Sequence, residues 1–143
     1  MCIHQISVFV ENRTGRLSDI TGVLAKHEID IRALSIADTT DFGILRLIVN
    51  QPEKAVAALK EAGITVSKTE VIAVRLRDEP GSLHNILTVL RDQGVVVEYA
   101  YAFITRKDTD ACVILRVEDN EKAIRALQAT GETLIAGAEL YEL

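Results

Sequence analysis

The sequence predicts an α+β protein built from two ferredoxin-like βαββαβ sandwiches in tandem, each an antiparallel sheet with its helices on one face. The first observation behind this prediction is a repeat: ENRTGRLSDITGVL, around Gly15, returns 66 residues later as RDEPGSLHNILTVL, around Gly81. The second is that residues alternate between apolar and polar before each copy of this segment and follow a helical period within it. Almost no chain is left over, so we expect two modules, residues 1–69 and 70–143.

Each module begins with a strand and a helix. Alternation over residues 5–11 is typical of a half-buried strand, and Asn12–Gly15 ends it. A helical apolar stripe then runs from the glycine to about His27. The apolar residues of this strand and helix are Ile6, Val8, Val10, Leu17, Ile20, Val23 and Leu24.

The rest of the module reads as a hairpin, a second helix and a last strand. Strands are predicted over Ile29–Ile36 and Ile44–Val49, separated by turn-rich residues. Pro52 suits a first helical turn, and Gly63 suits the end of that helix. Residues 64–77 must supply both the last strand of one copy and the first of the next. The second copy gives Val71–Leu76, Leu83–Arg91, Val95–Phe103, Ala111–Val117, Glu121–Ala129 and Thr133–Tyr141.

Composition narrows the class of protein. Hydrophobic residues make up 48% of the 143, yet no apolar run approaches the ~18 residues that cross a bilayer. The start of the chain reads as a strand and not as a signal peptide, which predicts a cytoplasmic protein without a membrane partner. The net charge of −5, with scattered Lys and Arg, weighs against a nucleic-acid partner.

No pattern in the sequence predicts catalysis. Cys2 and Cys112 occupy unrelated positions in the two copies and have no nearby partner of a metal-binding pattern. Neither a phosphate-binding loop nor a dinucleotide glycine motif occurs. We therefore expect no catalytic residues, no metal and no cofactor.

The repeated glycine loop has a chemistry of its own. A glycine lets the backbone approach a ligand, and the amides at the start of the following helix suit a carboxylate. Asn12, or Asp78 in the second copy, is placed to hold an ammonium group. These features fit the zwitterionic head of a free amino acid. The alternative to a ligand site is a tight strand-to-helix turn, which needs glycine whether or not anything binds.

At this loop the sequence resembles the ACT domain family, whose loop reads Asn or Asp, any residue, Pro, Gly, any residue, Leu between the same two elements. The resemblance covers both copies and implies amino-acid sensing at an interface between two modules. In the serine-binding members of this family, a His, an Asn and a second Asn contact the ligand. The corresponding positions of copy one hold Val10, Asn12 and Asp30, in that order. The same places in copy two hold Leu76, Asp78 and Val96, so the resemblance does not imply serine specificity.

The resulting hypothesis is a small regulatory protein, a homodimer, that senses an amino acid or similar carboxylate and acts through a separate metabolic enzyme. We expect copy one to be the better site, with copy two mainly a packing partner. The alternative is a regulatory subunit that docks an enzyme without binding a ligand. The candidate ligand-binding residues are Asn12, Thr14, Gly15, Arg16, Leu17 and Asp30 in copy one, and Asp78, Gly81 and Leu83 in copy two.

Overall fold

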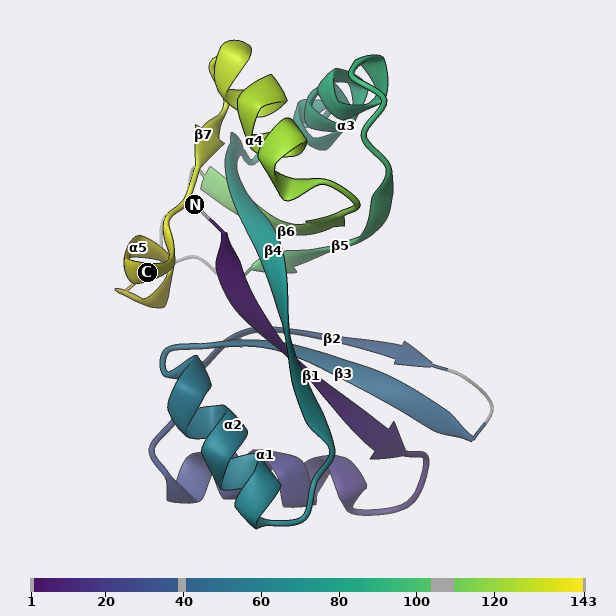
Figure 1. Ribbon diagram of the computed structural model, residues 1–143, viewed down its shortest axis with the longest axis vertical. Helices are drawn as coiled ribbons and strands as arrows, with labels where there is room; N and C mark the ends of the chain where they lie inside the picture. The colour runs from purple at the N-terminus through teal and green to yellow at the C-terminus, as the bar shows by residue number, and fades with distance from the viewer. Residues whose placement is uncertain (1, 39–40, 104–109, 143) are drawn as a thin grey trace. The chain divides into compact units, whose positions relative to one another are not determined.

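The structure is a computed structural model that describes residues 2–38, 41–103 and 110–142 (Figure 1). The chain divides into two compact units. The N-terminal unit is His4–Thr69, and the C-terminal unit is Glu70–Leu143 together with Met1–Ile3.

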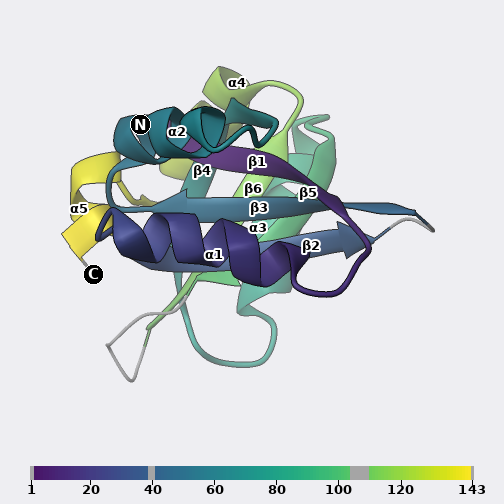
Figure 2. The same cartoon turned by 90° about the horizontal axis from the view of Figure 1, so that it is seen from below.

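The N-terminal unit is a sheet with two helices on one face. Its elements are β1 (Ile3–Glu11), α1 (Arg16–Lys26), β2 (Ile31–Asp38), β3 (Phe42–Val49), α2 (Pro52–Glu61) and the start of β4 (Val66–Arg77). β3 pairs antiparallel with both β1 and β2, and Phe9 N donates to Thr65 O, 3.2 Å away, on the other side of β1. Seen from below, α1 runs along β2 and β3, while α2 lies beside β1 (Figure 2).

The core of this unit lies between the sheet and the helices. Every second residue of β1 and β3 points to this layer and packs against the apolar stripes of α1 and α2. The strand alternation and the helical period therefore place apolar side chains in the same core. The buried core residues are Ile6, Val8, Val10, Ile20, Leu24, Ile29, Leu45, Leu47, Val49, Ala55, Leu59 and Ile64.

The C-terminal unit repeats this arrangement. Beyond β4 it contains α3 (Ser82–Asp92), β5 (Val97–Phe103), β6 (Asp110–Val117), α4 (Asn120–Ala129) and β7 (Thr133–Leu134). β6 pairs antiparallel with β4 and β5, and β7 pairs antiparallel with β4. The predicted α+β class with two βαββαβ units is thus confirmed. Its core residues are Ile72, Val74, Ile86, Leu90, Val95, Val113, Leu115, Val117, Ala123, Leu127 and Leu134.

The junction between the copies is a single strand. β4 runs for 12 residues, Val66–Arg77, and the boundary between the two units falls after Thr69, within it. The segment contains neither glycine nor proline and is rich in β-branched residues, which favour extended backbone. One strand therefore supplies both the last strand of the first copy and the first strand of the second.

The strand predicted over Thr133–Tyr141 is wrong. Only β7 is extended there. Ile135, directly after β7, donates its N–H to Ala73 O at 2.9 Å, and the helix α5 (Gly137–Glu142) begins two residues later. Ala, Glu and Leu favour a helix, and the short helix buries Leu140 completely. Its Glu139 carboxylate lies 2.6 Å from the Arg75 guanidinium.

The helices of the described residues are short. None combines the length and the hydropathy that crossing a membrane requires.

Candidate functional site

The loop between β1 and α1 is a tight turn closed by a left-handed glycine. Gly15 has a φ of 83°, a value that costs an L residue roughly 1–2 kcal/mol. Arg13 N donates to Glu11 O at 2.8 Å, Arg16 N to Arg13 O at 3.3 Å, and Asp19 N to Gly15 O at 2.9 Å. A Cβ built on Gly15 would meet nothing within 4 Å, so this side of the loop is open. We call residues 12–17 loop 1.

The second copy repeats this backbone bond for bond. Gly81 has a φ of 91°, and a Cβ on it would again meet open space. The N–H groups of Glu79, Ser82 and Asn85 donate at 2.9, 3.3 and 3.0 Å to the carbonyls that correspond to those in loop 1. The turn itself therefore requires both glycines, as the alternative reading held. A ligand site has to be argued from the side chains around them.

Arg16 is the side chain that most distinguishes loop 1. Its Nε is buried, and the described part of the chain offers it no hydrogen-bond acceptor. A buried donor without a partner costs about 1–3 kcal/mol, which an incoming anion would recover. Ser82 stands at the same position in the second copy, and there Asp78 replaces Asn12 and Glu79 replaces Arg13. Loop 1 thus suits a carboxylate, whereas the second loop repels one.

The end of the sheet beside loop 1 completes its surroundings. Asn12 N donates to Asp41 O at 3.1 Å, and Asp41 directly precedes β3. A Cβ on Gly43 would lie 3.5 Å from Ile36 Cγ2 and 3.8 Å from Asn12 Oδ1. Thr14 is exposed in the same loop, and Leu17 is exposed in the first turn of α1. The structure therefore brings together all the predicted residues of copy one except Asp30.

Asp30 lies at the opposite end of the unit. Asp30 N donates to Asn50 Oδ1 at 3.0 Å, Asn50 N donates to Asp30 O at 3.1 Å, and the carboxylate lies 3.1 Å from Arg32 Nη1. β2 begins there, paired with the end of β3, whereas the end of β2 pairs with Gly43 next to loop 1. The intervening strand spans about 23 Å. Figure 2 shows β2 ending on the side where β1 turns back into α1.

The predicted residues of copy two lie around a different surface. Asp78, Gly81 and Leu83 are all exposed. A hollow of about 210 Å³ adjoins this loop, and Glu79 and Glu132 outnumber Arg77 in its lining. Its remaining lining residues are Leu76, Ser82 and Asn85.

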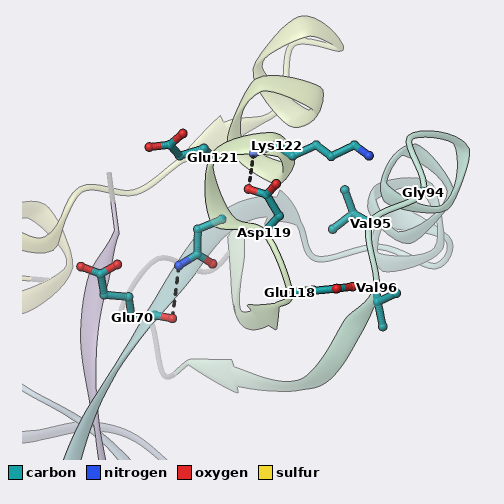
Figure 3. A pocket seen from close by; sticks show the side chains of 9 residues that line it. Glu70, Gly94, Val95, Val96, Glu118, Asp119, Glu121 and Lys122 are labelled. Carbon is teal, nitrogen blue, oxygen red and sulfur yellow. Dashed lines mark hydrogen bonds between the residues drawn. The ribbon is translucent and has the colours of Figure 1, made fainter.

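A larger hollow, which no sequence motif indicated, lies at the start of α4 (Figure 3). Its volume is about 560 Å³, and four carboxylates and one ammonium group line it. Asp119 caps α4 by accepting from Lys122 N at 3.1 Å, and Asn120 Nδ2 donates to Glu70 O at 3.3 Å. With this excess of negative charge, the hollow is unsuited to a ligand carboxylate. Its lining residues are Glu70, Gly94, Val95, Val96, Glu118, Asp119, Asn120, Glu121 and Lys122.

Nucleophilic and metal chemistry find no support in the described residues. Across residues 2–38, 41–103 and 110–142, no cluster of three or more His, Cys, Asp or Glu side chains could hold a metal ion. Burial raises the pKa of the Cys112 thiol to about 12, so this thiol stays protonated at neutral pH. A protonated, buried thiol is a poor nucleophile.

This protonation state predicts the pattern of alkylation. With iodoacetamide at pH 8, we expect Cys2 to be labelled and Cys112 to remain unmodified until the protein is unfolded in denaturant, because Cys2 is only half-buried and Cys112 is fully buried. Peptide mass spectrometry checks this result. Equal labelling of both cysteines in the folded protein would contradict the buried position of Cys112.

The family follows from a match along the whole chain. The family model described as "ACT domain pair" matches residues 1–143. The chain belongs to the ACT domain pair family. The resemblance seen in the glycine loops is thereby confirmed for both modules.

Solved structures show the same ACT pair fold. Protein BT0572 from Bacteroides thetaiotaomicron is 40% identical, with a TM-score of 0.94, over 100% of this chain and 98% of that one. The ligand-free regulatory subunit of aspartate kinase from Thermus thermophilus is 16% identical, with a TM-score of 0.64, over 88% and 91% of the two chains. The corresponding subunit from Thermus flavus is 16% identical, with a TM-score of 0.62, over 90% and 92%. No curated protein matches the chain.

Proposed function

We propose that this ACT pair is a cytoplasmic regulatory protein, not an enzyme, that senses a free amino acid at loop 1. The observation that carries the proposal is the buried Nε of Arg16 in loop 1, a cationic donor without an acceptor among the described residues. An amino-acid carboxylate supplies both the charge and the hydrogen bond that this group lacks.

The rest of loop 1 fits the same ligand. Arg16 N and Asp19 N already donate within the loop, and helix geometry leaves the N–H groups of Leu17 and Ser18 without acceptors inside α1. Together with the positive end of the helix dipole, these groups favour a carboxylate. Asn12 Oδ1 is the acceptor in loop 1 for the ligand ammonium group.

A second copy of the chain completes the site in this proposal. β2 pairs with β3 on one side, and none of the described strands pairs with its other side. An open edge of this kind favours pairing with another strand. A two-fold axis through the middle of β2 would pair it antiparallel with β2 of another copy, bringing Asp30 of that copy next to loop 1. The ammonium group would then lie between Asn12 and a carboxylate from the partner.

The Thermus structures suggest how binding would be transmitted. By name they are regulatory subunits of an aspartate kinase, and they share this fold. By analogy, we propose that ligand binding here changes the association of the ACT pair with a separate metabolic enzyme.

A thermal-shift screen of the twenty amino acids tests the proposal. A ligand at 100 times its dissociation constant should add about 2.7 kcal/mol to the free energy of unfolding. For a chain of this size, we expect such a ligand to raise the melting temperature by several degrees, since 1 kcal/mol corresponds to roughly 2–8 °C. If none of the twenty shifts the transition, the proposal fails.

One observation favours the second candidate, a subunit that docks an enzyme without a ligand. Phe9 and Phe42 are 51% and 45% exposed on the sheet face away from the helices, and their ring centroids are 5.3 Å apart. Exposed aromatic groups of this kind are common at protein interfaces. A negative amino-acid screen combined with loss of enzyme binding in Phe9→Ser would favour this second function.

A further inference from the structure

Three apolar side chains remain exposed in loop 1 and on β2. Leu17 is 41%, Ile36 48% and Leu34 53% exposed. In the β2–β3 register, Leu34 and Ile36 stand opposite the core residues Leu47 and Leu45, so both side chains lie on the helix-bearing face of the edge strand. Leu17 lies one turn before the buried Ile20, on the sheet-facing stripe of α1. We call Leu17, Leu34 and Ile36 the apolar shelf.

Gly43 is buried between Asn12 of loop 1 and Ile36 of the shelf. It lies inside β3 without a positive φ, so its backbone conformation does not require glycine. Glycine in a strand weakens that strand and often marks the close approach of another group. A Cβ there would point at Ala37 O, Ile36 Cγ2 and Asn12 Oδ1, at 3.3, 3.5 and 3.8 Å. The missing side chain therefore lets Asn12 of the polar loop and Ile36 of the shelf lie close to one another.

The second copy keeps the scaffold but not the shelf. Ala100 and Ala102 stand in β5 where β2 has Leu34 and Ile36, and Ala111 stands where β3 has Gly43. The core residues opposite the two alanines are still large, Leu115 and Val113. The fold thus tolerates small residues at these positions. The large apolar residues of copy one are consequently not explained by the packing of the unit itself.

We propose that the amino acid bound at loop 1 has a large apolar side chain, of the size of leucine, that lies against Ile36 and Leu17. This inference rests on the proposed function and specifies its ligand class. The carboxylate meets Arg16 at the polar end, and the side chain extends past Gly43 to the shelf. Each CH₂ group that leaves water on the shelf improves affinity by up to about fourfold. A polar side chain would lose its hydration there without gaining a partner.

A ligand series on the unmodified protein tests the class. Titration calorimetry with L-alanine, L-valine, L-leucine, L-serine and L-aspartate should give affinities that rise from alanine to leucine, with leucine at least about tenfold tighter than alanine. Serine or aspartate binding as tightly as leucine would overturn the inference and leave the proposed amino-acid sensing in place. If none of the five amino acids nor any other of the twenty binds, the sensing proposal itself fails.

A pair of variants tests the location. Ile36→Ala, which copies the residue at position 102, should weaken leucine binding about tenfold and leave alanine binding nearly unchanged. The control is Val96→Ala, an exposed apolar truncation in the C-terminal unit, where the side chain is 55% exposed. Sedimentation velocity on both variants establishes whether the oligomeric state is preserved. If the leucine-to-alanine affinity ratio of Ile36→Ala equals that of the unmodified protein, the shelf does not hold the side chain.

Discussion

Arg16→Gln is expected to weaken amino-acid binding by at least about 30-fold while the free protein stays folded. The buried Nε of Arg16 contacts no acceptor among the described residues, so its removal breaks no bond within the free protein. In the complex the same change removes a charged partner from the ligand carboxylate. Calorimetric titration measures the affinity, and thermal unfolding without ligand should show a free energy of unfolding that is unchanged or raised by up to about 1–3 kcal/mol, because an unpaired buried donor is removed.

Arg13→Gln is the matched control for this loss. Arg13 lies three residues earlier in the same loop and carries the same charge, but its Nε is 3.1 Å from Glu11 Oε2 and both side chains are largely exposed. Exposed ion pairs of this kind contribute about 0–1 kcal/mol. We expect Arg13→Gln to bind the ligand nearly as well as the unmodified protein. An equal loss in both variants would mean that overall loop charge, and not Arg16, attracts the ligand.

The fold could be predicted from the sequence because repetition and periodicity agree at every element. The helical stripe Ile20, Val23 and Leu24 and the alternation Ile6 and Val8 both face the same buried layer. The same pattern recurs 66 residues later, so the ends of each helix and strand could be predicted from two copies. Most predicted ends lie within about two residues of the observed ones, which is the uncertainty expected at frayed element ends.

Two features depend on tertiary structure and escaped the sequence patterns. Residues 133–141 contain too few alternating positions to distinguish a strand from the short helix α5, and burial of Leu140 decides between them. The distance between Asp30 and loop 1 is fixed by the β2–β3 register, which family position alone does not reveal. The sequence offered the polar residues of copy one as candidates, whereas the unpaired Arg16 Nε and the close packing around Gly43 required coordinates.

Leu34→Lys is expected to abolish both dimer formation and the response to ligand. Leu34 lies in the middle of the open edge strand β2 and exposes 53% of its surface. Lysines on edge strands oppose strand-to-strand pairing, and here two of them would face one another across the two-fold axis. Light scattering after size exclusion should give the mass of a single chain. The melting temperature should then no longer rise with the amino acid, because Asp30 of the second copy is absent from the site and an apolar side chain of the shelf has become charged.

The repeat supplies the control for this prediction. Ala100→Lys introduces the same charge at the equivalent position of β5, in the unit whose loop has Ser82 in place of Arg16. We expect this variant to remain dimeric and to keep its ligand response. If Ala100→Lys dissociates the dimer and Leu34→Lys does not, the copies associate through the C-terminal unit. A monomeric Leu34→Lys that still binds the amino acid with full affinity would show that loop 1 is sufficient and that Asp30 takes no part in binding.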